Sequence, residues 1–208
     1  MPSPIQRPTE NDYITAEENA EWLNTPSPFD ELDDEWYQLI IFFVFHVPVP
    51  DLSARSKSLI EYGWGSNSRT GDFKKLKNRF IKFGNMDEET FVCEESWAQL
   101  RATIQNNDLM DFPNNVIVEW VSYRKAKTTE IDSLLAHIRN SFAHGRLAFY
   151  NNDNEVYIAM EDIDNNKHVS ARMILSKKTL INWKIIIESG PNMKTKELEL
   201  VLNRIKND

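Results

Sequence analysis

A stripe of polar side chains runs through residues 128–144, where the spacing of apolar residues predicts a helix. At about 100° per residue, His137, Asn140, Ser141 and His144 fall on one side of this helix, apart from its apolar side. The two histidines titrate closest to physiological pH, which suits proton transfer. Outer sides of core helices usually carry Lys and Glu, so these imidazole, amide and hydroxyl groups mark a candidate site.

Arg139 adds a permanent positive charge on the far edge of the apolar side of the same helix. A guanidinium can bind two phosphate oxygens at once, and an imidazole can move a proton to or from a hydroxyl, so together they suit phosphodiester chemistry. On a straight helix, Arg139 and His144 point about 140° apart. They meet only if the last turn unwinds at Gly145 or if two chains combine their groups. The alternative is structural, because a histidine before a helix-ending glycine also suits the helix dipole.

The run RNSFAHG, from Arg139 to Gly145, resembles the signature of the HEPN superfamily (higher eukaryotes and prokaryotes nucleotide-binding domains). Its ribonuclease members carry Arg, a polar residue, three further residues and then His near the end of a core helix. Asn140 occupies the polar position here. With a helical body before the motif and a hairpin and helix after it, the resemblance extends over about residues 30–190.

This resemblance implies metal-independent cleavage of RNA without a cofactor, leaving a 2′,3′-cyclic phosphate and a 5′-hydroxyl. It implies that His144 is the general base or acid, that Arg139 neutralises charge on the phosphate, and that Asn140 orients the phosphate or the histidine. His137 and Ser141 are candidates for supporting roles. Because ribonucleases of this superfamily build a composite site at a dimer interface, a homodimer is expected.

The resemblance also implies a biological setting for the chain. An endoribonuclease of this kind is expected to be a toxin or a phage-defence effector with an inhibitory or activating protein partner. The alternative is a non-catalytic HEPN-like module for RNA binding or protein assembly. The intact spacing from Arg139 through Asn140 to His144 favours the enzyme.

A basic helix predicted over residues 69–83 is the candidate platform for the RNA backbone. Residues 69–82 carry six basic residues and one acidic residue, a net charge of +5. Three phenylalanines, Phe73, Phe80 and Phe83, interleave with the basic residues, so the alternative is a solvated face above an aromatic core stripe. The candidate RNA contacts are Lys74, Lys75, Lys77, Arg79 and, directly after the motif, Arg146.

Composition excludes several other classes of protein. The 208 residues carry a formal charge of −8, which argues against a generally cationic surface. In residues 1–36, ten acids and one base give −9, which leaves +1 for the rest. One cysteine excludes an internal disulfide and a thiolate metal cage, and no metal-binding histidine set or phosphate-binding glycine loop is visible. The lack of a secretory signal or a membrane-length apolar run predicts a cytoplasmic protein.

The hydrophobic pattern predicts the elements that must position the site. Short strands are expected at 146–150, 155–161 and 167–175, joined by turns at 151–154 and 162–166. For residues 39–47, a buried strand is the alternative to a helix. The expected helices span 15–24, 30–46, 53–62, 69–83, 94–106, 113–127, 128–144 and 176–188, with one more within 192–208.

These elements predict a mainly α-helical bundle of the HEPN type, with a small antiparallel hairpin or sheet at about 146–175, near its C-terminal end. Residues 1–28 are expected to form an acidic, partly disordered arm, residues 29–190 the HEPN-like domain, and residues 191–208 a helical tail. The charge of the arm is consistent with an RNA mimic or a docking segment.

Overall fold

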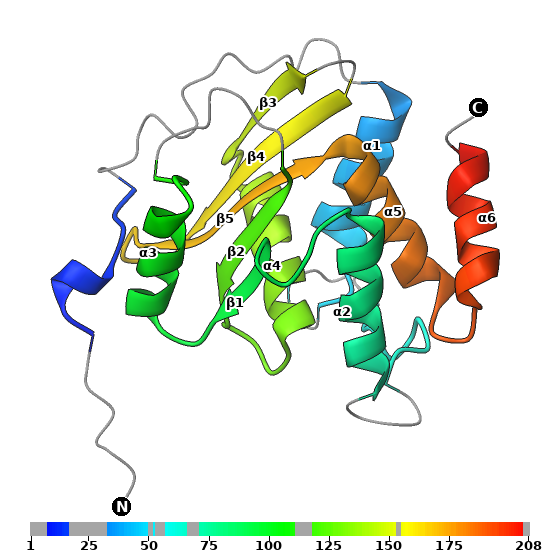
Figure 1. Cartoon of the computed structure of the whole chain (residues 1–208), viewed down its shortest axis with the longest axis horizontal. Coiled ribbons are helices and arrows are strands. Elements are labelled where there is room, and N and C mark those ends of the chain that lie inside the picture. Colours follow the sequence, from blue (N-terminus) through cyan, green and yellow to red (C-terminus); the bar gives the residue numbers. More distant parts are fainter. Residues whose placement is uncertain are drawn as a thin grey trace, which may run out of the picture.

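The structure, a computed structural model, describes residues 8–16, 33–49, 52, 57–65, 71–110, 118–152 and 155–205. Its centre is a five-stranded sheet in the order β1-β2-β5-β4-β3 (Figure 1). The strands are β1 (Phe91–Glu94), β2 (Trp120–Arg124), β3 (Leu147–Asn152), β4 (Glu155–Ile163) and β5 (Val169–Ser176). The helices are α1 (Asp34–Ile41), α2 (Gly71–Phe83), α3 (Trp97–Asn106), α4 (Glu130–Ala143), α5 (Lys177–Ser189) and α6 (Thr195–Ile205). A π-helical segment, η4 (Phe42–His46), continues α1, and a short 3-10 turn, η1 (Glu10–Asp12), precedes it.

The expected fold class, a mainly helical bundle with a small hairpin, is wrong, because the chain is a mixed α/β protein. β1 and β2 pair in parallel, and the chain crosses from one to the other by way of helix α3. β2 also pairs antiparallel with β5 and so joins the three C-terminal strands into one sheet. The helix expected over 113–127 is replaced by β2, with residues 113–117 outside the described part. The sequence of β2, WVSYR, is rich in residues that favour strands, and pairing with the distant β5 decides the conformation.

The other expected elements are largely confirmed, with shifted ends. The three C-terminal strands and α2 to α6 fall close to their predicted ranges. α1 and η4 fill most of the range 30–46, so the strand alternative at 39–47 is excluded. Residues 57–65 contain turns in place of the helix expected over 53–62, whose residues 53–56 lie outside the described part. From residue 17 onward, the helix expected over 15–24 lies outside the part of the chain that the structure describes.

Two hydrophobic cores lie on the two faces of the sheet (Figure 1). The larger core packs α1, α2, α4, α5 and α6 against one face, and the smaller core packs α3 and residue 14 against the other. Successive residues of β4 alternate between them, since Ile158 and Met160 belong to the larger core and Ala159 to the smaller one. Every residue of β5 is buried, because both of its faces are covered.

Residues 8–16 lie against the edge of the sheet beside α3. Ile14 is 2% exposed, and its carbonyl accepts a hydrogen bond from Val169 N at 2.7 Å. The Tyr13 ring stacks on His168, with 3.8 Å between the ring centroids. This part of the predicted acidic arm is therefore docked on the domain. The division of the chain at residues 28 and 190 stays a prediction.

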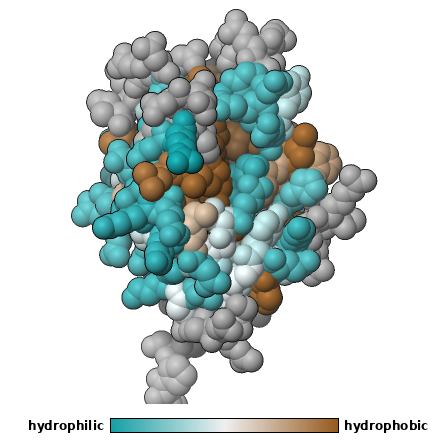
Figure 2. Space-filling model, turned by 90° about the vertical axis from the view of Figure 1, so that its right-hand side faces the viewer, coloured by the Kyte–Doolittle hydropathy of each residue, from teal (hydrophilic) through white to brown (hydrophobic). Residues whose placement is uncertain are grey.

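The face of the molecule on the side of α6 is mostly hydrophilic, with hydrophobic residues gathered in its upper half (Figure 2). Large apolar side chains exposed in the described part of the chain are Tyr37, Ile41, Phe45, Ile60, Val118 and Leu200. Within the same residues, no helix combines the length and apolar character that a membrane crossing needs.

Candidate active site

Helix α4, which carries the motif, has well-defined ends. Thr129 begins it, with its hydroxyl accepting a hydrogen bond from Asp132 N at 3.0 Å. Gly145 follows it at φ +64°, a left-handed conformation that glycine adopts without steric cost, and Arg146 N donates to the Ser141 carbonyl at 2.9 Å. His144 lies between the last helical residue, Ala143, and Gly145. Its backbone angles, φ −98° and ψ 2°, are not helical, so the histidine of the motif has left the helix.

The polar stripe of α4 faces the sheet and is largely buried. Ser133, His137 and Ser141 are each at most 3% exposed. The Ser133 hydroxyl accepts hydrogen bonds from the backbone N–H groups of Ala126 and Lys127, at 3.0 and 2.8 Å, which holds the loop before the helix. The Ser141 hydroxyl donates to the His137 carbonyl at 2.9 Å. Both serines therefore make internal contacts, and Ser141 does not face solvent as a catalytic group would.

Asp162, on β4, is the centre of a buried hydrogen-bond network beneath the motif. Its Oδ2 atom lies 2.6 Å from His137 Nδ1, 3.2 Å from Asn140 Nδ2 and 3.2 Å from the Ser170 hydroxyl. Asp162 is only 3% exposed, so a carboxylate there depends on these donors for its stability. The network ties α4 to β4 and β5 at the level of the motif.

The contacts of His137 define its protons. Nε2 lies 2.8 Å from the carbonyl oxygen of Arg124, which can only accept a hydrogen bond, so Nε2 carries a proton. Nδ1 faces the Asp162 carboxyl group at 2.6 Å, so a proton also lies between those two atoms. Both ring nitrogens are thus occupied by protein partners. His137 holds the structure and is not placed to exchange protons with a substrate.

Arg139 and Asn140 extend the network toward the surface. The Asn140 amide donates through Nδ2 to Asp162, and its Oδ1 accepts from Arg139 Nη1 at 3.2 Å. Arg139 Nε is buried without a hydrogen-bond partner, and Asn140 is the one acceptor that the described residues offer this guanidinium. Arg139 is half-buried and keeps N–H groups free for a ligand.

His144 is exposed, and in the described part of the chain no hydrogen bond or ion pair engages its ring. Its backbone N–H donates to the Asn140 carbonyl at 2.9 Å. No hydrogen bond joins His144 to Arg139 among the described residues, consistent with the different directions expected from their spacing. The end of α4 thus presents a free imidazole and a partly free guanidinium, a pair that can bind phosphate and transfer protons.

A family model described as HEPN pEK499 p136 matches residues 7–186 of the chain. The chain belongs to this HEPN family. The resemblance drawn from RNSFAHG is therefore confirmed, and HEPN domains generally act on RNA as ribonucleases. No curated protein and no solved structure matches the chain.

Arg146 of this HEPN domain is engaged by the protein itself. It forms an ion pair with Glu161, and Glu161 is fully buried and also binds Arg172 at 2.9 Å. Arg172 reaches further, to the carbonyl oxygens of Leu109 and Met110, both at 2.6 Å. Any contact of Arg146 with phosphate would compete with this buried carboxylate.

Some basic side chains of helix α2 contact other parts of the HEPN domain, and others are exposed to solvent. Arg79 is 5% exposed and donates to the carbonyl oxygens of Gly190 and Met193, beyond the end of α5. Lys77 pairs with Glu130 at 2.6 Å, and Lys75 donates to the Pro191 carbonyl at 2.5 Å. Lys74 is exposed. The structure thus gives Arg79 a packing role, and Lys74 is the candidate cation best placed to meet RNA.

Sequence reasoning did not identify Asp162 as part of the site, because residues 162–166 were expected to form a turn. The available signal was the alternation of β4, since Asp162 lies two residues beyond Met160 on the face of the larger core. The donors that meet it come from α4 and β5, which are distant along the chain. Glu161 was expected as the last residue of a strand and was missed because its partners, Arg146 and Arg172, lie elsewhere along the chain.

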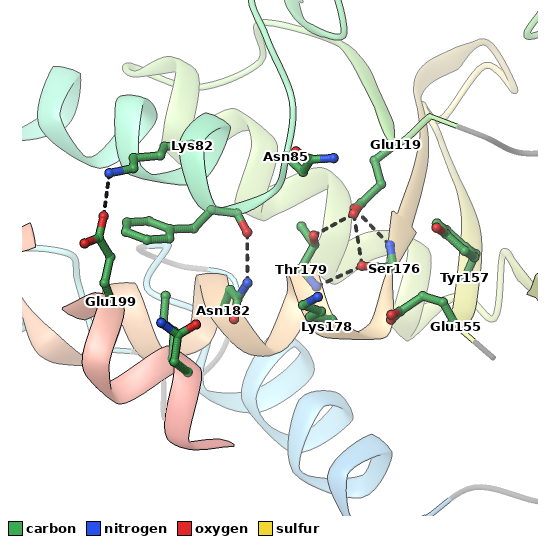
Figure 3. Close-up of a pocket in the computed structure, with 13 residues that line it drawn as sticks. Lys82, Asn85, Glu119, Glu155, Tyr157, Ser176, Lys178, Thr179, Asn182 and Glu199 are labelled. Carbon is green, nitrogen blue, oxygen red and sulfur yellow. Dashed lines mark hydrogen bonds and ion pairs between the residues drawn. The ribbon is translucent and has the colours of Figure 1, made fainter. Parts of the chain in front are cut away.

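A cavity of about 420 Å³ lies where β4 begins and β5 ends, and none of the predicted site residues lines it (Figure 3). Glu119 reaches over the start of α5, where its carboxylate accepts hydrogen bonds from Ser176 N, from the Ser176 hydroxyl and from the Thr179 hydroxyl, at 2.8 to 3.0 Å. Burial raises the pKa of Glu119. This carboxylate caps the helix, so the cavity wall is explained by the fold.

Within the described residues, no group of three or more His, Cys, Asp or Glu side chains is arranged to hold a metal ion.

Proposed function

We propose that this chain is an endoribonuclease that cleaves RNA without a metal ion, with Arg139 and His144 as its catalytic residues. The observation that carries the proposal is the end of α4, where an exposed imidazole and a partly free guanidinium stand in the HEPN motif. Asn140 links the Arg139 guanidinium to the protein, because its side-chain amide accepts from Arg139 through Oδ1 and donates to Asp162 through Nδ2.

The proposed reaction is an internal transfer at phosphorus. His144 takes the proton of the 2′-hydroxyl, the 2′-oxygen bonds to phosphorus, and the bond to the 5′-oxygen breaks as that oxygen takes a proton from water. The imidazolium then returns its proton to the solvent. Arg139 donates hydrogen bonds to the phosphate oxygens, where negative charge accumulates in the transition state. The products are a 2′,3′-cyclic phosphate and a 5′-hydroxyl. No cofactor enters this scheme.

We further propose that the active species is a homodimer whose site combines Arg139 of one copy with His144 of the other. The outer side of α1 and η4 supports this, because Tyr37, Ile41 and Phe45 are 58%, 48% and 51% exposed. A helix that is apolar on all sides is normally buried. The element that carries part of this stripe neighbours the motif helix, since the buried side of η4 packs against α4 and Phe43 stacks near Phe142.

The biological role that fits such a nuclease is a toxin or a phage-defence effector acting in the cytoplasm, restrained or triggered by a protein partner. In this proposal, the acidic N-terminal stretch competes with RNA or docks the partner. Because Ile14 is buried, the test neutralises Glu17, Glu18 and Glu21 to Gln and leaves residues 8–16 intact. Stronger RNA binding by this variant would support the competition, and unchanged binding would exclude it.

Incubation of the purified protein with total cellular RNA in excess EDTA tests the proposed activity. The wild type is expected to cleave, while the His144→Ala and Arg139→Ala variants are expected to lose cleavage and keep the wild-type circular dichroism spectrum. Arg204→Ala removes an exposed arginine from α6 and controls for the loss of charge. If all four proteins leave the RNA intact while binding it, the non-catalytic RNA-binding module is the better account.

A further inference from the structure

Asp162 has the position and the contacts of a residue that orients the Asn140 side chain of the motif from the sheet. It lies on β4, outside the motif sequence, and is buried under α4. Its Oδ2 atom accepts from Asn140 Nδ2 at 3.2 Å. An amide has its donor and its acceptor on opposite branches, so a carboxylate that binds Nδ2 directs Oδ1 the other way. In the structure, that Oδ1 meets Arg139 Nη1 at 3.2 Å.

The same carboxylate is itself fixed on two further sides. His137 Nδ1 lies 2.6 Å from Oδ2, and its ring is held by the Arg124 carbonyl at 2.8 Å. The Ser170 hydroxyl, on β5, donates to the same oxygen at 3.2 Å. Hydrogen bonds between buried partners of this kind restrict side-chain rotation, so Asp162 is a rigid base for the Asn140 amide.

We propose that Asp162 is a positioning residue for RNA cleavage, acting through Asn140 on the Arg139 guanidinium. The proposal rests on the nuclease function proposed above. Without the carboxylate, the Asn140 amide is free to turn, and it can then present its N–H groups to Arg139, which has no acceptor for them. Arg139 loses the contact that orients it toward phosphate. Asp162 touches no substrate in this scheme.

A double-mutant cycle on cleavage kinetics tests this role. Asp162→Asn is expected to lower kcat on the order of 10²-fold, the scale of a misplaced catalytic group, with KM changed by less than about twofold. If Asp162 acts through Asn140, Asp162→Asn has no further effect in the Asn140→Ala background. Ser122→Ala is the matched control, expected to keep kcat near the wild-type value. It removes a buried hydroxyl on β2 that has no hydrogen-bond partner among the described residues and so lies outside this network.

A second readout does not depend on cleavage. The side-chain amide signal of Asn140, assigned by its loss in Asn140→Ala, is expected to shift in the nitrogen–proton NMR spectrum of Asp162→Asn and to stay in place in Ser122→Ala. The proposal would be overturned if the kcat losses of Asp162→Asn and Asn140→Ala multiply in the double variant. It would also be overturned if Asp162→Asn leaves the Asn140 amide signal unchanged. A shifted signal in a protein that cleaves no RNA would refute the nuclease function and would leave standing only that Asp162 orients the Asn140 amide.

Discussion

The two histidines of the motif region, His137 and His144, have the same side chain but different surroundings, and their surroundings decide their roles. Both lie on the same polar stripe, and the sequence alone gave them related roles. In the structure, His137 is 3% exposed with both ring nitrogens engaged, whereas His144 lies exposed beyond the last turn. The motif residues and their spacing could be read from the chain. The buried partner Asp162 could not, because its role depends on contacts between α4, β4 and β5.

This separation predicts opposite results for two alanine substitutions. His137→Ala is expected to lower the free energy of unfolding by about 3–5 kcal/mol, since it leaves the Asp162 carboxylate buried without its main partner. His144→Ala is expected to change it by less than about 0.5 kcal/mol while lowering the cleavage rate about 10²- to 10⁴-fold. Denaturant unfolding and cleavage kinetics measure the two effects. A strongly destabilised His144→Ala protein would mean that His144 is structural.

At the scale of elements, the sequence anticipates the helix boundaries of the site and the three C-terminal strands, but it does not anticipate β1 and β2. The threonine and glycine that bound α4 are local signals, so the helix was predicted almost to the residue. β1 and β2 are short, and what makes them strands is pairing with each other and with β5. Local propensity carries little of that information, which is why the helical bundle was wrong.

Gly145, which ends α4, tests the local geometry of the motif. A Cβ there would meet no atom within 4 Å, so the cost of a side chain comes from its φ of +64° alone. Gly145→Ala is expected to lower the free energy of unfolding by about 1 kcal/mol. Gly145→Asn is expected to cost less, because Asn tolerates this conformation. Equal stability of all three proteins in thermal unfolding would argue against the left-handed turn after His144.

Glu119, which caps α5, predicts a pH dependence of stability. Burial raises the pKa of this carboxyl group above its ordinary value, so the folded state binds the proton more tightly than the unfolded state. Its contribution to stability is therefore complete below pH 4.5 and is lost as the pH rises through the folded pKa. The unfolding free energy of the wild type minus that of Glu119→Gln should fall as the pH is raised from 4 to 8. A difference that rises over this interval would mean that folding lowers the pKa of Glu119, which contradicts the account.

At the scale of the whole molecule, the fold packs the motif helix over one face of the mixed sheet and leaves an apolar stripe exposed on the neighbouring α1 and η4. Residues 39–45 are apolar throughout, a pattern typical of a helix that is buried on all sides. The single chain buries only part of that surface. A second copy over Tyr37, Ile41 and Phe45 would complete the burial that the sequence predicts.

Subunit mixing tests the composite dimer. Arg139→Ala and His144→Ala proteins, each inactive alone, are expected to recover about one quarter of the wild-type activity when mixed in equal amounts. Half of the dimers are then hybrids, and each hybrid has one complete site. Ile41→Glu is expected to give monomers by light scattering and to abolish cleavage by keeping the chains apart. An active Ile41→Glu monomer would exclude the shared site.

The chemical identity of the RNA ends tests the central claim most directly. RNA treated with the wild-type protein in EDTA, with His144→Ala as the matched sample, is analysed for the groups at each new end. Transfer to the 2′-oxygen with Arg139 and His144 at the phosphate predicts 2′,3′-cyclic phosphates and 5′-hydroxyls that appear with the wild type and not with His144→Ala. New 5′-phosphates, or the same cyclic ends from the His144→Ala protein, would contradict it.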